Sequence, residues 1–233
     1  MRPLPFRLLA ITPPSAPVDP AIIDTWERCG ALASGLALLL RDPDATPEQL
    51  LAAEGRLAPL RRGAEARGIP VLLSIDERAL ARIATSPALH SLAGLQLRGD
   101  PSVDALQTAR RLATARLLLG RSCHGEPAGA HQHVDYTCLA PIFSPSTTQR
   151  GVDKRAIGLD PLRAWSAQAY ARIFALGGIN AANARACVDA GAFGIAGIGL
   201  FFGEPAAVAQ DVAAAAAAIQ ARDVQPAPTT PGS

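Results

Sequence analysis

Eight short apolar runs recur along the chain at nearly even spacing, and this repetition constrains the fold more than any other feature. Within each run the apolar character is almost continuous, whereas a strand with one face in water would alternate with polar residues. Near-continuous apolar strands are typical of parallel sheets that are covered on both faces. The eight predicted strands are residues 6–11, 35–40, 70–75, 94–97, 116–120, 136–139, 172–176 and 194–198.

Residues that start helices stand between these runs. Thr46 and Gln49 have the spacing of a capping box around Pro47, and Asp19 followed by Pro20 predicts another helix start. The segment between the fifth and sixth runs carries the weakest helix signal. Strands and helices are therefore expected to alternate. Further helix starts are predicted at 76–77, 100–102, 160–162, 180–183 and 203–205.

Eight strand–helix units in 233 residues predict an α/β fold of the TIM (β/α)8 barrel type. A doubly wound open sheet is the alternative. We favour the barrel because the runs are evenly spaced and no G-x-G-x-x-G pattern follows the first one. A single barrel is expected over residues 1–221, and residues 222–233, rich in Pro and Thr, are expected to form a disordered tail.

The charge distribution argues against nucleic-acid and membrane partners. The net charge is +2, and the 22 basic residues, of which only Lys154 is a lysine, are spread along the sequence. No apolar stretch approaches the roughly 18 residues that a membrane span needs. The four cysteines form no C-x-x-C pair, which favours a reducing compartment. We expect a soluble cytoplasmic protein, and no pattern in the sequence specifies its oligomeric state.

Glycines follow the seventh and eighth predicted strands. In a (β/α)8 barrel these two junctions commonly bind phosphate, because glycine lets backbone N–H groups approach an anion and a following helix N-terminus adds a favourable dipole. Tight turns are the alternative reason for glycine at these positions. We predict a phosphate site at Gly177, Gly178, Gly197 and Ile198.

A long connection follows the sixth predicted strand. Connections of this length without their own structure are usually functional or disordered. Hydroxyl groups followed by basic side chains could close over a phosphate or diphosphate as a flap, and a solvated loop is the alternative. The candidate ligands in this connection are Thr147, Thr148, Arg150 and Lys154.

His124 follows the fifth predicted strand and is the candidate general acid or base, because histidine exchanges a proton near neutral pH. A surface-loop histidine is the alternative. Cys123 is not expected to form a nucleophilic dyad with it, since neighbours on an extended segment point to opposite sides. His131 and His133 could join His124 on a metal, but no carboxylate or cysteine completes a convincing set.

Several short motifs together resemble one known family in order and spacing, and the resemblance covers nearly the whole barrel. This family comprises thiamine-phosphate synthase and the thiazole tautomerase TenI. The first half of the chain resembles it mainly at Ala10-Ile11-Thr12, Leu40-Arg41 and Asp76. The motifs that carry the resemblance in the second half are residues 120–124, 134–136, 140–143, 158–159, 176–179 and 190–192.

The resemblance implies a TIM barrel that holds hydroxyethylthiazole phosphate on the glycine loops, in an enzyme of thiamine biosynthesis. The synthase branch joins this thiazole to hydroxymethylpyrimidine diphosphate with the help of Mg²⁺, for which Asp76 and Asp100 would be the carboxylate ligands. Arg41 would contact the diphosphate, with Thr147 beyond strand six. Ser122 would either position His124 or contact a diphosphate oxygen.

The departures from the family pattern gather on the pyrimidine-diphosphate side. The lysine expected two residues after Arg41 is replaced by Pro43, and the amide expected before Asp76 is replaced by Ile75. Because the thiazole-phosphate side is retained, we predict a one-substrate isomerase that acts through His124 and needs no cofactor. Thiamine-phosphate synthase, with Mg²⁺, is one alternative, and a non-catalytic thiazole or thiamine phosphate sensor is another. An enzyme acting on a sugar phosphate ranks lower.

Overall fold

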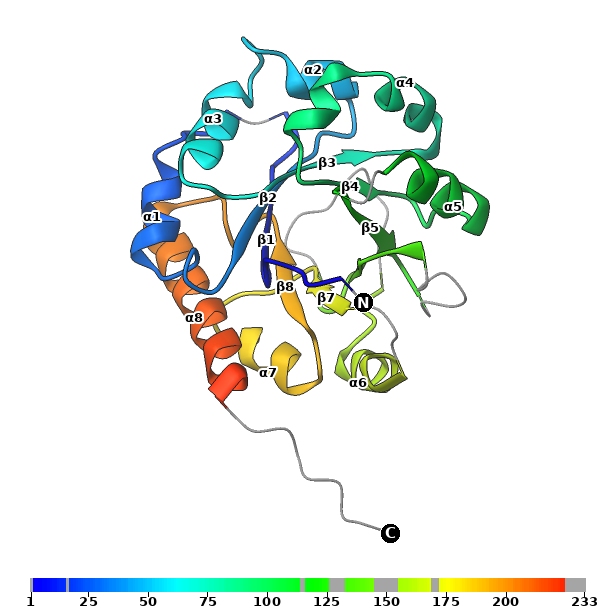
Figure 1. Cartoon of the computed structure of the whole chain (residues 1–233). Helices are drawn as coiled ribbons and strands as arrows, with labels where there is room; N and C mark the ends of the chain where they lie inside the picture. The colour runs from blue at the N-terminus through cyan, green and yellow to red at the C-terminus, as the bar shows by residue number, and fades with distance from the viewer. Residues whose placement is uncertain are drawn as a thin grey trace.

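The computed structural model describes residues 2–15, 17–113, 116–125, 133–144, 155–168 and 172–224. Eight parallel strands form a closed barrel in which each strand pairs with the next and β8 pairs with β1 (Figure 1). The predicted barrel is therefore confirmed, and the open sheet is excluded. The strands are β1 Leu8–Ile11, β2 Leu36–Leu40, β3 Val71–Ile75, β4 Gly94–Leu97, β5 Leu118–Cys123, β6 Tyr136–Leu139, β7 Arg172–Leu176 and β8 Gly194–Gly197.

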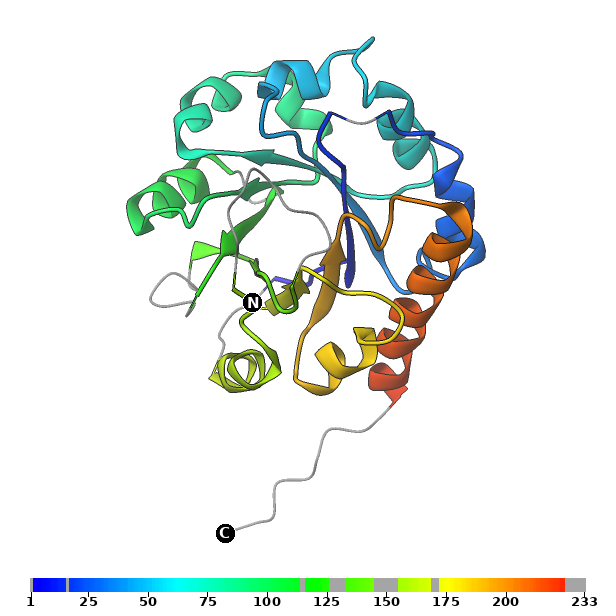
Figure 2. The same cartoon turned by 180° about the vertical axis from the view of Figure 1, so that it is seen from behind.

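Helices surround the ring of strands, as the two opposite views show (Figures 1 and 2). Thr46 caps α2 with the predicted capping box, in which its side chain and that of Gln49 each accept from the other's backbone N–H. Between β5 and β6 no α-helix is found in the described residues 124–125 and 133–135. The helices are α1 Ile22–Arg28, α2 Pro47–Leu51, α3 Ala58–Ala66, η1 Glu77–Ala79, α4 Leu80–Ala84, η2 Pro87–Ser91, α5 Val103–Leu112, α6 Leu159–Gln168, α7 Ala184–Asp189 and α8 Pro205–Val224.

Each predicted strand overlaps an observed one, but β5 is displaced along the sequence. It begins at Leu118 and continues to Cys123, three residues past the predicted end at Gly120. The extension pairs with β6 from Arg121 beside Thr137 to Cys123 beside Leu139. Polar Arg121 and Ser122 therefore lie within a strand, because main-chain pairing rather than apolar character decides where β5 ends.

Aromatic side chains fill the amino end of the barrel. Phe6, Tyr136 and Phe174 are fully buried, with ring centroids 5.3–5.5 Å apart. A Cβ at Gly120 would lie 2.2 Å from the Tyr136 ring, so only glycine leaves room for this packing. The barrel interior is thus a packed core at this end, and among the described residues the space for a ligand lies at the carboxyl end of the strands.

The outer parts of the chain add three observations. Helix α8 continues to Val224, three residues beyond the expected end of the barrel at residue 221. No helix in the described residues is long and apolar enough to cross a membrane. The four cysteines are free, and burial raises the pKa of Cys138 and Cys187 to about 12, so these two thiols are unreactive near neutral pH.

Candidate functional site

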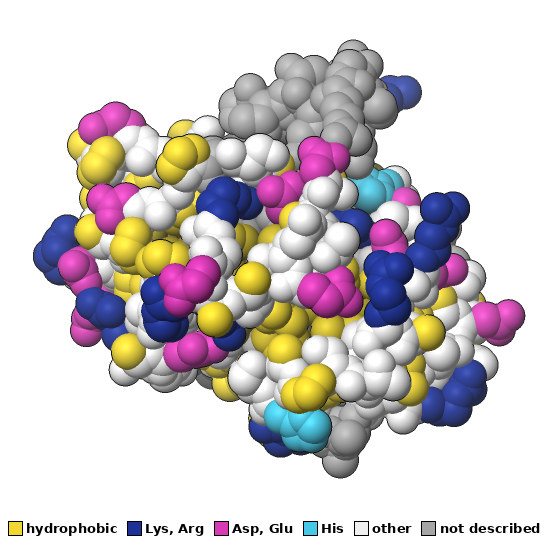
Figure 3. Space-filling view, turned by 90° about the horizontal axis from the view of Figure 1, so that it is seen from above, with side chains coloured by type: hydrophobic (Ala, Val, Ile, Leu, Met, Phe, Trp, Pro, Cys, Tyr) yellow, Lys and Arg dark blue, Asp and Glu magenta, His cyan; other side chains and the backbone are white. Residues whose placement is uncertain are grey.

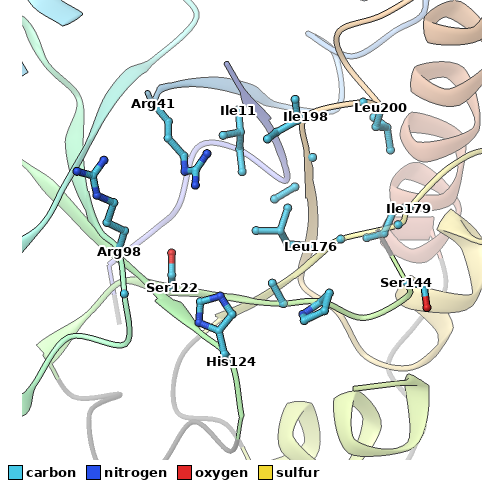
Figure 4. A pocket seen from close by; sticks show the side chains of 18 of the residues that line it. Ile11, Arg41, Arg98, Ser122, His124, Ser144, Leu176, Ile179, Ile198 and Leu200 are labelled. Carbon is cyan, nitrogen blue, oxygen red and sulfur yellow. The ribbon is translucent and has the colours of Figure 1, made fainter. Parts of the chain in front are cut away.

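A cavity of about 910 Å³ opens at the carboxyl end of the barrel. It is lined by residues at or just beyond strand ends that continue the inward-facing positions of the strands, since alternate residues of a strand face the same side. Figure 4 shows charged and polar side chains on one side of this cavity and apolar side chains on the other. The inward ring consists of Ile11, Arg41, Asp76, Arg98, Ser122, His124, Ala140, Leu176 and Ile198.

His124 is held at the cavity by Asp100. The Asp100 Oδ2 lies 2.7 Å from His124 Nδ1, and Asp100 Oδ1 accepts a hydrogen bond from the His124 backbone N–H at 2.8 Å. The register that places Leu97 beside Arg121 also brings positions 100 and 124 to the same level of β4 and β5. Both Gly99 and Asp100 have left-handed backbones, with φ of 82° and 53°, which turns the carboxylate toward the imidazole.

Ser122 lies two residues before His124 on the same strand and lines the same cavity. Its Oγ accepts a hydrogen bond of 3.3 Å from the amide Nε2 of Gln96 on β4, which is buried. Figure 4 shows Ser122 and His124 beside each other at the cavity wall. The neighbouring Cys123 is buried and points away, and burial raises its thiol pKa, as expected of an inert cysteine.

Two arginines face the cavity from β2 and β4. Arg98 Nη2 lies 3.3 Å from Asp76 Oδ2, and Arg98 Nη1 donates to the backbone oxygen of Asp42 at 3.5 Å. Burial lowers the pKa of the Arg41 guanidinium, and the charge of Arg98 lowers it further, while Asp42 opposes the shift. The two guanidinium groups therefore share one electrostatic environment at this side of the cavity (Figure 4).

The two aspartates expected to hold Mg²⁺ are engaged with other partners. Asp76 pairs with Arg98 and also accepts a hydrogen bond from the backbone N–H of Ala79 at 3.0 Å. Asp100 pairs with His124 and is not among the residues that line the cavity. Within the described residues no three His, Cys, Asp or Glu side chains are grouped as metal ligands. Because Asp76 is paired with Arg98 and Asp100 with His124, the two carboxylates are not directed at a shared Mg²⁺ site of the kind that the resemblance implies.

Backbone groups dominate the opposite side of the cavity. Gly177 and Gly178 have φ of 96° and 64°, and a Cβ on either would lie under 3 Å from Pro141 or Phe143. Glycine is therefore required here by the turn and by the adjacent β6–α6 connection. Across the described residues, no acceptor is found for the backbone N–H of Gly177, Gly178, Ile198 or Gly199.

A helical turn follows β8 directly. Ile198 O accepts hydrogen bonds from the backbone N–H groups of Phe201 and Phe202, at 3.0 and 2.9 Å. The regular helices begin later, α7 at Ala184 and α8 at Pro205, so their N-termini are not the groups closest in sequence to the glycines. This short turn, rather than α7 or α8, supplies the first helical N–H groups beside the cavity.

Sequence reasoning placed part of the cavity lining but missed other members. Asp211 of α8 lines the glycine side, where its Oδ1 accepts from the Ala181 N–H at 2.7 Å. The apolar wall of Leu176 and Ile11 was also not singled out. The alternation of inward-facing and outward-facing residues along each strand could have identified that wall. The flap candidates Thr147, Thr148, Arg150 and Lys154, together with His131, lie outside the described residues.

On the face seen in Figure 3, basic and acidic side chains are intermingled without a concentrated region of one sign. The fold and the cavity define the class of this protein as a (β/α)8 barrel with a cavity built at the carboxyl ends of its strands, where barrel enzymes carry their chemistry.

Comparison with known proteins gives the family. The family model described as thiamine monophosphate synthase matches residues 8–201, and the chain belongs to this enzyme family of thiamine biosynthesis. A putative thiamine-phosphate synthase of Geobacter sulfurreducens is 32% identical over 182 residues, covering 76% of this chain and 78% of the relative. A thiamine-phosphate synthase of Roseiflexus castenholzii is 29% identical, covering 87% and 86%.

A solved structure shares the fold. The thiamine phosphate pyrophosphorylase of Pyrococcus furiosus superposes with a TM-score of 0.67 and 21% sequence identity, covering 93% of this chain and 96% of that one. At this identity the likeness concerns the barrel and not the details of the site.

Proposed function

We propose that this protein is an isomerase that moves a proton on a thiazole carboxylate phosphate, as the tautomerase branch of its family does. The observation that carries the proposal is the Asp100–His124 pair, with its 2.7 Å contact at the edge of the cavity. An isomerisation of this kind needs one group that takes a proton from one ring position and returns a proton at another. It needs no second substrate and no metal.

The substrate phosphate is assigned to the glycine side of the cavity. The N–H groups of Gly177, Gly178, Ile198 and Gly199 have no acceptor among the described residues, and backbone N–H groups of this kind bind phosphate. Apolar side chains, among them Leu176 and Ile11, line the space between this side and the arginines. A thiazole ring packs against such a surface by apolar contact.

Proton transfer is assigned to the imidazole of His124. Because an ionised carboxylate only accepts hydrogen bonds, Nδ1 of His124 carries the proton that faces Asp100. The other ring nitrogen, Nε2, is then the basic atom that takes a proton from the substrate and returns it. Ser122, held by Gln96, is a neighbouring hydroxyl that positions the ring or the substrate.

Thiamine-phosphate synthase remains the second candidate, favoured by the names of the curated relatives. That reaction needs charges for a diphosphate and ligands for Mg²⁺. In this chain Asp76 is paired with Arg98, Asp100 is paired with His124, and Pro43 stands at the family's lysine position. These three features weigh toward the isomerase.

Two assays on the purified full chain separate the candidates. The first offers the non-aromatic thiazole carboxylate phosphate in EDTA and follows the aromatic product by ultraviolet absorbance. The second offers hydroxymethylpyrimidine diphosphate, hydroxyethylthiazole phosphate and Mg²⁺, with a known synthase in parallel, and follows thiamine phosphate by fluorescence. Product only in the first assay supports the isomerase, and product only in the second establishes the synthase. Binding without product in either assay identifies a sensor.

The His124→Gln variant tests the catalytic assignment. Isomerisation is expected to slow by about 10²- to 10⁴-fold, the usual contribution of a positioned acid–base group. Affinity for inorganic phosphate should stay unchanged, because the glycine side does not include this side chain. Full activity of the variant would contradict the role of His124.

A further inference from the structure

We infer that Arg98, together with Arg41, forms a metal-independent subsite for a carboxylate of the substrate. This inference rests on the proposed function, because it assigns the end of the substrate opposite the phosphate. The residues on the charged side of the cavity differ from the Mg²⁺ site that the family resemblance implies. Arg98 provides a positive charge beside Asp76, where synthase chemistry would call for a metal.

The contacts of Arg98 hold its guanidinium at the cavity wall without using all its donors. Nη2 pairs with Asp76 at 3.3 Å and Nη1 donates to the Asp42 oxygen at 3.5 Å. The side chain is 24% exposed, so the group is fixed by protein on one side and open to the cavity on the other. A guanidinium has five N–H donors in a planar fork, which leaves donors for a ligand.

Basic side chains outnumber acidic ones among the described residues that line this side of the cavity. Asp42, which follows Arg41 in the chain, is paired with Arg56 at 3.0 Å. A carboxylate is an anion whose two oxygens match the guanidinium fork of Arg98. The charged lining residues on this side are Arg41, Arg78, Arg98, Asp76 and Glu77.

The strand order places this subsite across the cavity from the phosphate side. In a closed ring of eight strands, β2 to β4 lie opposite β6 to β8, and β5 lies between them. A substrate with phosphate at one end and carboxylate at the other would therefore span the mouth of the barrel past His124 on β5. Figure 4 shows this order, with Arg41 and Arg98 on the opposite side of the cavity from Ile198 and Leu176.

The test uses two ligands that differ only in the carboxylate. Aromatic thiazole carboxylate phosphate and hydroxyethylthiazole phosphate are titrated calorimetrically into the full-length protein, in EDTA and again in Mg²⁺. We expect the carboxylated compound to bind about tenfold more tightly or better, the gain of a charge-assisted hydrogen bond. Mg²⁺ should change this preference by less than about twofold, since Arg98 already occupies Asp76.

Three variants complete the titration. Arg98→Gln should remove the preference and leave the affinity for hydroxyethylthiazole phosphate intact. Asp76→Asn should preserve or strengthen the preference, because it removes the charge that competes for Arg98. Arg163→Gln is the matched control, since Arg163 is an exposed arginine of α6 paired with Asp160 outside the cavity, and it should behave as the wild type. Circular dichroism checks that each variant folds.

Equal affinity for the two ligands in EDTA would overturn the subsite, and so would a preference that requires Mg²⁺ and disappears in Asp76→Asn. The result is separable from the proposed function. A carboxylate preference without isomerase turnover supports the subsite and refutes the isomerase. Turnover without the preference supports the isomerase and refutes the subsite. Failure of both ligands to bind refutes both proposals.

Discussion

The two sides of the cavity present different chemical groups, side chains on one side and backbone N–H groups on the other. On the side of β2 to β5, charged and polar side chains provide every candidate interaction, from Arg41 to His124. On the side of β6 to β8, backbone groups of the glycine turns face the cavity next to apolar side chains and Asp211. Side chains can be exchanged without changing the path of the chain, whereas backbone donors exist only while the turns keep their shape.

The largest effect in this comparison is expected from Asp100→Asn. Asparagine tolerates the left-handed backbone and can still accept from the His124 N–H, so the change isolates the carboxylate charge. Isomerisation should fall by about 10- to 100-fold, less than on loss of the imidazole itself. Steady-state kinetics with a melting curve measures this, and a wild-type rate would remove Asp100 from the mechanism.

A pair of glycine substitutions separates shape from binding on the backbone side. Gly178→Ala should lower the free energy of unfolding by about 2–4 kcal/mol, because φ is 64° and the new Cβ would lie 2.6 Å from Ser144 O. Gly199→Ala should leave the unfolding free energy within about 0.5 kcal/mol, since nothing lies within 4 Å of its Cβ.

Chemical denaturation measures both variants, and phosphate titration of the folded Gly199→Ala protein follows. A methyl group in the open space beside the N–H groups should weaken phosphate binding severalfold. If the two variants were equally stable, the packing explanation for Gly178 would be wrong.

The smallest effect concerns acid stability on the charged side. Burial raises the pKa of the Asp42 carboxyl, but hydrogen bonds from the N–H groups of Asp44 and Ser15 and the contact with Arg56 lower it by more. A lowered folded-state pKa means that the stabilisation is complete at neutral pH and is lost on acidification below about pH 4.

Asp42→Asn should therefore be less stable than the wild type at pH 7, by about 1 kcal/mol, and should lose less stability between pH 5 and pH 3. Urea denaturation at several pH values measures this slope. Asp160→Asn, at a carboxyl that is 94% exposed, is the control and should keep the wild-type slope. Parallel slopes for Asp42→Asn and the wild type would contradict the assignment.

Sequence patterns predicted the barrel and the inward positions better than the pairings between side chains. Apolar runs and capping signals locate strands and helices because they are local properties. The Asp100–His124 and Asp76–Arg98 pairs depend on the register between neighbouring strands, which the sequence does not encode locally. Asp100 was therefore assigned to a metal rather than to the imidazole. The extension of β5 was missed for the same reason, since pairing with β6 determines it.

The positions of the predicted site residues were also easier to predict than their interactions. Gly177, Gly178, Gly197, Ile198, Arg41, Ser122 and His124 all line one cavity, as the position of strand ends in a barrel implies. Their roles stay predictions, and so do those of Thr147, Thr148, Arg150 and Lys154.

The aromatic packing of Phe6, Tyr136 and Phe174 has a kinetic consequence. Because these rings close the amino end of the barrel, the opening at the carboxyl end is the entrance that the described residues leave for a ligand. Product must depart before the next substrate molecule can occupy the cavity, and a compound that resembles the product meets the same opening. Inhibition by product in such a site is competitive with substrate, so accumulation of product slows turnover directly.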